Sequence, residues 1–378
     1  MKLGFLIYSY FPYGGQQRDF LKIAKECIAR GHQVIVYTMK WEGQKQHGLE
    51  LRIVPVASRL RLRRYRLFTE WVLGQLQEDP CDLIVGFNKM PGLNLYFAAD
   101  PCFEEKAQTQ RGGYYRYTPR YRHFKDYEQA VFGTGSSTRI LTLSPLQQQD
   151  YEKHYSGCSN RLFPLPPGVD PDRKYTDTDS ASMMRRQLRE ELSLDDSDLL
   201  VLQVGSGFKV KGVDRSLHAI ASLPVGIRKR ITYLLIGQDK PGRFLRLARG
   251  LGVSDQFQVM PGRNDIPRFL LGADLLLHPA YSESAGYVLL EATIAGLPVL
   301  TTGTCGYAHY IKKAGSGLVC SEPFVQQELN ENLLHMLTSS DRATWQLNGI
   351  EFGRHEDLYS MAGAAADHIE QIGHTAYR

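Results

Sequence analysis

Short apolar runs alternate with amphipathic stretches along the chain. Residues 3–8 and 34–37 are apolar runs of strand length, and Gly14 and Gly15 interrupt the chain after the first run. Between them, apolar residues recur every three to four positions, as on one face of a helix: Phe20, Ile23, Ala24, Cys27 and Ile28. A strand, a helix and a second strand in this order predict a βαβ unit with parallel strands.

The same alternation divides the chain into two halves. Further strands are expected at 51–54, 83–87 and 140–143 in the first half, and at 199–204, 231–236, 257–260, 274–278, 298–301 and 318–320 in the second. A Pro/Gly turn and a polar stretch separate the halves near residue 168. The pattern predicts an α/β protein with two Rossmann-like, doubly wound domains that face an inter-domain cleft, where such sheets bind ligands.

The length agrees with two domains, because 378 residues are about 2.5 times the roughly 150 of one domain. We expect an N-terminal domain over 1–167, a C-terminal domain over 168–350, and a final helix within 351–378 that packs back on the first domain. The net charge of +5 is too small for a general polyanion binder. The six cysteines form no C-x-x-C pair, and no apolar run of about 18 residues suggests a membrane span. These features favour a cytoplasmic protein.

A glycine-rich loop, residues 205–212, follows the first strand of the second half. Val210 stands where a dinucleotide-binding fingerprint requires glycine, and Val213 stands where a Walker A loop requires lysine. Lys209 and Lys211 instead suit a diphosphate, although two solvated lysines are an equally good interpretation. Gly14 and Gly15 are ambiguous in the same way, since a glycine pair at a βα turn often serves only the turn.

The segment 283–291 is the most informative motif. Two carboxylates, Glu283 and Glu291, bracket a helix start at which Ala285 and Gly286 offer backbone N–H groups to a phosphate. Glu283 could meet a sugar and Glu291 both hydroxyls of a ribose, whereas a structural interpretation makes Glu291 a buried partner of a cation. A glycosidase pair is disfavoured, because these residues would not flank one glycosidic bond.

Together, these motifs resemble a known family. The E-x7-E element with its Ala-Gly, the Gly-Gly loop, the Lys-Gly loop and the run 262–264 are similar to the retaining GT-B glycosyltransferases of family four. The stretches 10–12, 86–92, 121–123 and 205–206 resemble more narrowly the lipopolysaccharide core hexosyltransferases of the glucosyltransferase I group. Members of that group glycosylate the first inner-core heptose. The resemblance covers nearly the whole chain.

The resemblance implies roles for individual residues. Asp19, Asp100 and Glu283 are expected at the reaction centre. Arg263 is expected at the nucleobase and Glu291 at the ribose. The family usually has a basic residue directly before its lysine, whereas Val210 stands there in this chain. The implied donor-binding residues are Gly14, Gly15, Arg173, Lys209, Lys211, Arg263, Glu283, Ala285, Gly286 and Glu291.

The small net charge hides two local basic segments. Five arginines lie within residues 59–66, and a second segment, 111–125, interleaves cations with aromatic residues. Basic and aromatic residues together suit an anionic membrane surface, single-stranded nucleic acid or a merely solvated face. We favour the membrane, because the donor motifs require a sugar acceptor. The residues expected there are Arg111, Tyr114, Tyr115, Arg116, Arg120, Tyr121, Arg122 and Lys125.

The resulting hypothesis is a retaining hexosyltransferase that moves a hexose from a UDP-sugar to an inner-core heptose of lipopolysaccharide. The hexose could be glucose, galactose or an N-acetylhexosamine. The family implies no cofactor and no metal, and we expect no nucleic-acid partner and a location at the inner face of the cytoplasmic membrane. Two alternatives remain open: a retaining transferase for another anionic glycolipid, and a non-catalytic two-lobed binding protein.

Overall fold

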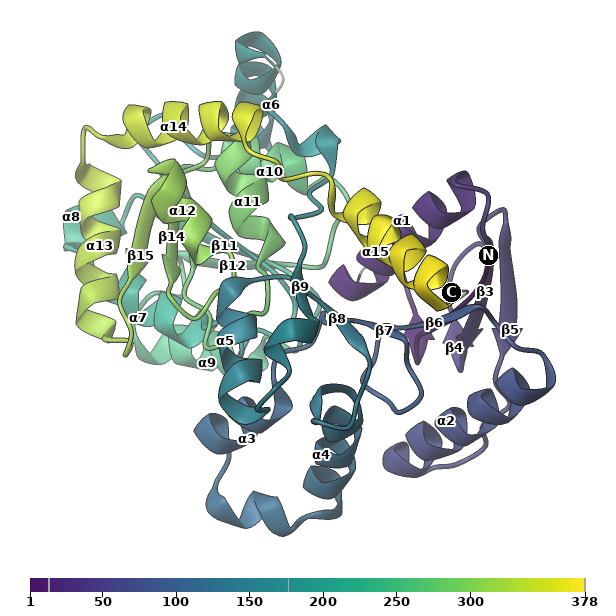
Figure 1. The fold of residues 1–378 in the computed structure, drawn as a ribbon. Coiled ribbons are helices and arrows are strands. Elements are labelled where there is room, and N and C mark those ends of the chain that lie inside the picture. Colours follow the sequence, from purple (N-terminus) through teal and green to yellow (C-terminus); the bar gives the residue numbers. More distant parts are fainter. Residues whose placement is uncertain (13, 176, 377–378) are drawn as a thin grey trace. The chain divides into compact units, whose positions relative to one another are not determined.

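The computed structural model describes residues 1–12, 14–175 and 177–376. The chain forms two compact units, one comprising Met1–Gly168 and Tyr359–Arg378 and the other Val169–Leu358. Each unit is built on its own parallel sheet (Figure 1). The predicted α/β fold with two Rossmann-like sheets is therefore confirmed.

The first unit contains a seven-stranded sheet in the order β5-β3-β1-β6-β7-β8-β9. Its strands are β1 (Lys2–Leu6), β3 (Gln33–Thr38), β5 (Leu49–Ile53), β6 (Leu83–Gly86), β7 (Leu95–Phe97), β8 (Arg139–Thr142) and β9 (Leu162–Pro164), and β2 (Ser9–Tyr10) pairs separately with β4 (Lys40–Trp41). Its helices are α1 (Gly15–Ala29), α2 (Arg61–Glu78), α3 (Phe103–Gln110), η1 (Gly113–Tyr117), α4 (Pro119–Phe132), α5 (Pro145–His154), η2 (Ser159–Arg161) and α15 (Met361–Ala376).

The second unit contains a six-stranded parallel sheet in the order β12-β11-β10-β13-β14-β15. Its strands are β10 (Leu199–Val204), β11 (Ile231–Ile236), β12 (Phe257–Met260), β13 (Leu275–His278), β14 (Val299–Thr302) and β15 (Gly317–Cys320). Its helices are η3 (Pro171–Arg173), α6 (Thr178–Glu191), α7 (Val213–Ser222), α8 (Val225–Arg228), α9 (Gly242–Gly250), α10 (Ile266–Gly272), α11 (Tyr287–Ile294), α12 (Ala308–Ala314), α13 (Gln326–Thr338) and α14 (Arg342–His355).

The sequence missed β2, β4, β7 and β9. These strands have two or three residues each, which is too short for a periodic signal, and β9 ends at Pro164. Proline cannot donate a backbone hydrogen bond within a ladder, so it is tolerated at the edge of a sheet, and β9 is an edge strand.

The end of the chain is shared between the units. Helix α14 lies in the second unit, where Gly349 and Gly353 pack so closely on α11 that an added Cβ would collide with Thr293 and Ile294 respectively. Residues 351–358 therefore stay with this unit, beyond the expected boundary at 350. Helix α15 packs on α1 in the first unit, and Arg30 of the α1 C-cap donates to Asp367 at 2.6 Å.

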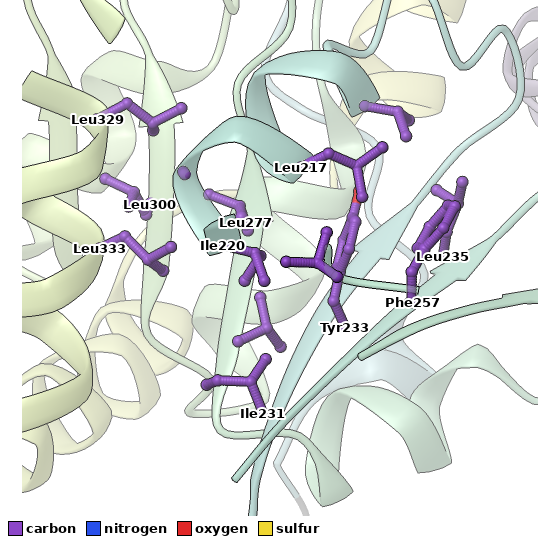
Figure 2. Packing of buried hydrophobic residues seen from close by; sticks show 14 of the residues in the cluster. Leu217, Ile220, Ile231, Tyr233, Leu235, Phe257, Leu277, Leu300, Leu329 and Leu333 are labelled. Carbon is purple, nitrogen blue, oxygen red and sulfur yellow. The ribbon is translucent and has the colours of Figure 1, made fainter. Parts of the chain in front are cut away.

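The core of the second unit explains why its strands were predictable. Leu217 and Ile220 of α7, Tyr233 of β11 and Leu277 of β13 pack together with no exposed surface (Figure 2). Helices cover both faces of such a sheet, so its strands contain continuous apolar runs, as in residues 199–202 of β10. Each buried leucine of this kind stabilises the fold by about 1.5–3 kcal/mol. The core thereby fixes the strand ends from which the loops of the site begin.

Candidate functional site

The second unit brings two predicted loops together at the point where its strand order reverses. Strands β10 and β13 are neighbours, whereas the chain visits β11 and β12 between them on the other side of β10. The carboxyl ends of strands at such a switch point form the usual ligand site of an open α/β sheet. Residues 205–212 follow β10, and residues 279–286 follow β13.

Gly212 joins these two loops. Its φ of 71° lies in the left-handed region, and an added Cβ would collide with the carbonyl oxygen of Pro279. Only glycine satisfies both conditions. The backbone N–H of Tyr281 also donates to the Val210 carbonyl oxygen at 2.8 Å, so the loops are hydrogen-bonded as well as packed.

The structure distinguishes the two lysines of the first loop. The Lys209 side chain is exposed and has no hydrogen bond or ion pair within the described part of the chain. Lys211 is largely buried, and its backbone carbonyl oxygen accepts a hydrogen bond of 2.7 Å from the Gln203 side chain. Gln203 is fully buried in β10 and also accepts from the Ser216 hydroxyl at 2.7 Å. This buried amide fixes the position of Lys211.

Lys211 forms an ion pair with Glu283 of the second loop. Burial lowers the pKa of Lys211 to about 8, against a smaller opposite effect of the Cys305 thiol. The imidazole of His278 lies 3.6 Å from Glu283, measured from Nε2 to Oε2. Burial, and secondly the charge of Lys211, lower the pKa of His278 to about 3, so its ring is neutral. The site therefore combines a lysine, a carboxylate and a neutral imidazole.

Hydrogen bonds to backbone carbonyl groups hold the start of α11 and the loop before it. Gly286 precedes the helix with a φ of 97°, and the N–H of Tyr307 donates to the Ala285 carbonyl oxygen at 2.8 Å. The hydroxyls of Thr302 and Thr304 donate to the Ala280 carbonyl oxygen at 2.9 and 2.7 Å. The first amides of a helix have no partner within the helix, so this end can bind an anion. Glu291 follows in α11 and is 7% exposed.

The two arginines predicted for the donor differ in their contacts. The Arg173 side chain is 13% exposed, and its Nε lies 3.4 Å from an Asp172 carboxylate oxygen. Its buried Nε and Nη1 have no hydrogen-bond partner among the described residues. Arg263 is instead held by Asp265 through two hydrogen bonds of 2.8 Å and lies 4.9 Å from the ring centre of Phe269. The guanidinium of Arg173 is therefore more available to bind an anion than that of Arg263.

The first unit has a cavity of about 480 Å³ at the equivalent place, where loops follow β1, β6 and β7. Asp100 lines it, together with Gln16 and Gln17 of α1. Gly14 is the N-cap of α1, and Asp19 is 4% exposed on that helix. The structure therefore brings one of the three predicted reaction-centre residues into this cavity.

Gly15 begins α1, and a Cβ added there would meet no atom within 4 Å, so no packing in the structure requires a glycine at this position.

The segment of α3, η1 and α4 carries the predicted membrane residues and forms one end of the first unit, with η1 between the two helices (Figure 1). Tyr114 is 90% exposed, and Arg116 and Arg122 are exposed too. Tyr121 and Lys125 point inward, because the Tyr121 hydroxyl donates to Glu104 at 2.8 Å and the Lys125 ammonium pairs with the same carboxylate at 3.2 Å. The remaining predicted residues line the cavity: Arg111, Tyr115 and Arg120.

Sequence reasoning missed a buried carboxylate that supports the cavity. Glu128 of α4 is fully buried, pairs with Lys89 at 2.6 Å and accepts from the backbone N–H groups of Phe103 and Glu104 at 2.7 and 3.0 Å. It also accepts from the Tyr155 hydroxyl at 2.6 Å. The only available signal was a glutamate on the same helix face as Phe124, Val131 and Phe132, and it is a weak one.

The described residues contain no group of three or more His, Cys, Asp or Glu side chains that could hold a metal ion. None of their helices is long and apolar enough to cross a membrane.

Comparisons with known proteins agree with this geometry. Residues 13–173 match the model of Glycosyltransferase Family 4, and residues 184–351 match that of Glycosyl transferases group 1. The chain is 48% identical to the lipopolysaccharide glucosyltransferase WaaG of Escherichia coli K12 over 370 residues, which are 98% of each chain.

Solved structures give the same result. The crystal structure of WaaG, a glycosyltransferase involved in lipopolysaccharide biosynthesis, superposes with a TM-score of 0.91 at 48% identity, over 97% of this chain and 98% of WaaG. Anabaena HepE, crystallised with UDP and glucose, has a TM-score of 0.75 at 18% identity, over 98% of this chain and 100% of HepE, and shares the fold. The chain therefore belongs to the GT-B glycosyltransferases, in the same family as WaaG.

Proposed function

We propose that this protein is a retaining hexosyltransferase that transfers a hexose from a UDP-sugar to an inner-core heptose during lipopolysaccharide core biosynthesis. The observation that carries the proposal is the 48% identity with a lipopolysaccharide glucosyltransferase over 98% of both chains. An alignment of this extent includes both sheets and both sets of loops, so it supports a shared reaction as well as a shared fold. Glucose is accordingly the first hexose to test.

The geometry of the second unit supports the donor half of the reaction. In the proposed complex, the diphosphate lies between the Lys211 ammonium and the N-terminal amides of α11, where a cation and a helix dipole both favour negative charge. Glu283 then accepts hydrogen bonds from sugar hydroxyls. The diphosphate then replaces the Glu283 carboxylate beside Lys211. The lysine remains charged, because one anion replaces another.

In such a reaction the bond between the anomeric carbon and the diphosphate breaks, and the bond to the acceptor oxygen forms on the same face. The leaving diphosphate accepts the proton of the acceptor hydroxyl. Negative charge builds on the diphosphate in the transition state, so the contribution of Lys211 and the α11 amides is electrostatic. We propose no metal ion and no further cofactor.

The exposed part of the α3–η1–α4 segment supports attachment to an anionic membrane. Tyr114 and Tyr117 are 90% and 78% exposed, and exposed arginines lie beside them. Aromatic rings suit the membrane interface, and each cation near an anionic surface contributes about 1 kcal/mol. We therefore place the reaction at the inner face of the cytoplasmic membrane, where a lipid-linked acceptor is accessible.

The test is transfer by the purified full chain. Truncated lipopolysaccharide that ends in the inner-core heptose would be the acceptor, and UDP-glucose, UDP-galactose and UDP-N-acetylglucosamine would be compared as donors. We expect UDP release and a product with an α-glycosidic linkage by NMR, as in the donor. The matched control is an acceptor that lacks the heptose. A lack of UDP release with every donor would refute the transferase, and equal release on the heptose-free acceptor would refute the acceptor.

A further inference from the structure

The second unit has a cavity of about 300 Å³ at the edge of its sheet where β13 and β14 begin. Asp274 and Pro298, the residues directly before these two strands, line it. Helices α6, α10, α11 and α14 contribute to the rest of its wall. The loop 279–286 of the candidate donor site follows the opposite, carboxyl end of β13, so the length of this strand separates the cavity from that loop.

A buried carboxylate of this cavity binds three guanidinium groups. The Asp274 side chain is 1% exposed and accepts the backbone N–H of Leu200 at 2.7 Å. Two arginines of α6 pair with it, Arg185 at 2.6 Å and Arg189 at 3.5 Å. Arg342, the first residue of α14, pairs with the same carboxylate. One carboxylate against three guanidinium groups leaves this cluster with a formal charge of +2.

The three arginines differ in position. Arg189 is 8% exposed and also donates to the Asp198 carbonyl oxygen at 3.0 Å, so it supports Asp274 from inside the protein. Arg185 and Arg342 line the cavity, and the side chain of each is 36% exposed. Neither of them pairs with a second carboxylate within the described part of the chain. One buried guanidinium is enough to neutralise Asp274, so the charges of Arg185 and Arg342 exceed what this carboxylate requires.

The hydrogen bonds of the two cavity arginines leave donors for a ligand. Nη1 of Arg185 donates to the carbonyl oxygens of Gly272 and Ala273 at 2.9 and 3.1 Å, which satisfies the last carbonyl groups of α10. Among the described residues, Arg342 forms one hydrogen bond, from Nη2 to Asp274, so its Nε and Nη1 groups can donate to a ligand. Arg342 also begins α14, and the helix dipole favours negative charge at this end.

The pKa of Asp274 shows that the charges of the cluster persist. Burial acts to raise this pKa, but the charges of Arg342 and Arg185 outweigh burial and hold it below its usual range. The carboxylate is therefore ionised at neutral pH and counts against only one of the three guanidinium groups. An anion in the cavity would meet the two remaining positive charges.

The other lining residues suit a hydroxylated organic group beside the anion. Ser182 of α6 and Gln346 of α14 line the cavity, and their side chains form no hydrogen bond with the described protein. Their hydroxyl and amide groups can each donate to and accept from a ligand hydroxyl. A volume of about 300 Å³ lies at the lower end of the range for small-molecule pockets, about 300–1,000 Å³. The cavity therefore has room for more than a bare anion.

We propose that this cavity is a second ligand site, which binds a small soluble phosphate monoester with a hydroxylated organic group. The phosphate lies against Arg185 and Arg342, and the hydroxyls meet Ser182 and Gln346. A phosphate monoester carries a charge of about −1.5 to −2 at pH 7, which balances the +2 of the cluster. Guanidinium groups also match the geometry of phosphate oxygens better than an ammonium does. The site is additional to the donor and acceptor sites, and it does not depend on the proposed function.

The test is binding of soluble probes to the full chain, measured by ligand-observed NMR. The probes are sorbitol 6-phosphate, sorbitol, gluconate and inorganic phosphate. We expect sorbitol 6-phosphate to bind at least about tenfold more tightly than sorbitol, because hydrogen bonds to charged groups contribute about twice as much as neutral ones. It should also bind more tightly than gluconate, which carries a single charge, and than inorganic phosphate, which lacks the organic group. Vesicles that contain phosphatidate should not displace it.

Variants locate the site. Arg342→Gln and Gln346→Glu are each expected to weaken binding of sorbitol 6-phosphate about tenfold or more. Gln346→Glu adds a carboxylate at an exposed position of α14 and leaves the ion pairs of Asp274 in place, so it tests the site even if Arg342→Gln fails to fold. Gln187→Glu is its matched control, because Gln187 is exposed on α6 and does not line the cavity. Gln187→Glu and Lys211→Ala should leave binding unchanged, and thermal unfolding checks that each variant is folded.

Several outcomes would overturn the proposal. Equal affinity for sorbitol and sorbitol 6-phosphate would mean that the arginines only support Asp274. Inorganic phosphate or gluconate that binds as tightly as sorbitol 6-phosphate would contradict the class of ligand, and displacement by phosphatidate vesicles would assign the site to a lipid headgroup. A loss of binding in Lys211→Ala would place the phosphate at the donor loops, and an equal loss in Gln187→Glu and Gln346→Glu would mean that the effect comes from net charge.

Discussion

The two units use the same position of the same fold in different ways. At the switch point of the second unit, the loops present backbone: Gly212 allows their close contact, and the N-terminal end of α11 lies in the second of these loops. At the switch point of the first unit, the loops present side chains, with Tyr8 after β1 and Asn88 after β6 lining a cavity. Backbone amides suit a diphosphate, which every nucleotide sugar shares, whereas side chains can distinguish one acceptor from another.

The units also differ in the group that supports each site. In the first unit the support is an ion, the buried Glu128 carboxylate against Lys89. In the second it is a neutral amide, Gln203, which holds the Lys211 carbonyl oxygen. Removal of one partner from a buried ion pair is more harmful than loss of one neutral hydrogen bond. The comparison therefore predicts unequal sensitivity to mutation.

Glu128→Gln tests this prediction and should have the largest effect. We expect it to destabilise the first unit by about 3–5 kcal/mol, because it leaves the Lys89 ammonium buried without its carboxylate. Gln203→Leu should destabilise the second unit by only about 1–3 kcal/mol. Native-state hydrogen exchange measures each unit separately. Similar losses of unfolding free energy in the two variants would contradict the predicted difference between the ionic and the neutral support. As a control, Glu128→Gln combined with Lys89→Met should recover part of the stability that Glu128→Gln loses.

Lys211→Ala should have the next largest effect, on catalysis. Removal of one preorganised charge at a transition state lowers kcat by about 10²–10³-fold, or about 2.7–4 kcal/mol. Lys209→Ala is the matched control, because Lys209 is the exposed lysine of the same loop, and it should lower kcat by less than about tenfold. The measurement is transfer under saturating donor and acceptor. Equal losses would mean that the burial of Lys211 does not identify the functional lysine.

A smaller effect is expected at the membrane. Arg116→Ser combined with Arg122→Ser should weaken binding to vesicles with anionic phospholipids by about 2 kcal/mol, which is roughly 30-fold. The control removes the same charge from the second unit through Arg246→Ser and Arg249→Ser, two exposed residues of α9. Co-sedimentation with vesicles at low and high salt measures both. Equal losses would show that net charge, and not the α3–η1–α4 segment, drives attachment.

The smallest effect is the pH dependence of UDP binding. Burial lowers the pKa of Lys211 to about 8, and the diphosphate binds to its ammonium form, so affinity should be nearly full at pH 7, about half at pH 8 and lower above it. The decline approaches tenfold per pH unit once Lys211 is deprotonated in the free protein. Calorimetry from pH 7 to 9 measures it. Lys211→Arg should abolish the dependence, because its guanidinium stays charged, and a persistent decline in that variant would assign the titration to another group.

The sequence predicted most strands because burial on both faces makes them continuous apolar runs, as in β11. It also predicted that Lys211 and Glu283 would belong to one site. It could not separate Lys211 from Lys209, because the direction of each side chain depends on the left-handed Gly207 and Gly212 around them. The direction of the two lysine side chains therefore depends on the backbone geometry of the loop, which the identity of the lysines does not reveal.

The inward direction of Tyr121 and Lys125 was equally inaccessible from the sequence. Both were expected at the membrane surface, since they lie among cations and aromatic residues in the chain. Their shared partner, Glu104, belongs to α3, and it reaches them only because α3 packs against α4. The pairing of Glu128 with Lys89 depends in the same way on contacts between distant segments.

The contact between Gly212 and the Pro279 carbonyl has a practical consequence for chimeric enzymes. A graft that exchanges residues 205–212 alone would place a foreign loop against the native residues 279–286, and any side chain at 212 would push them apart. Donor specificity is therefore best transplanted by moving both loops as one cassette, with crossover points inside the strands that precede them.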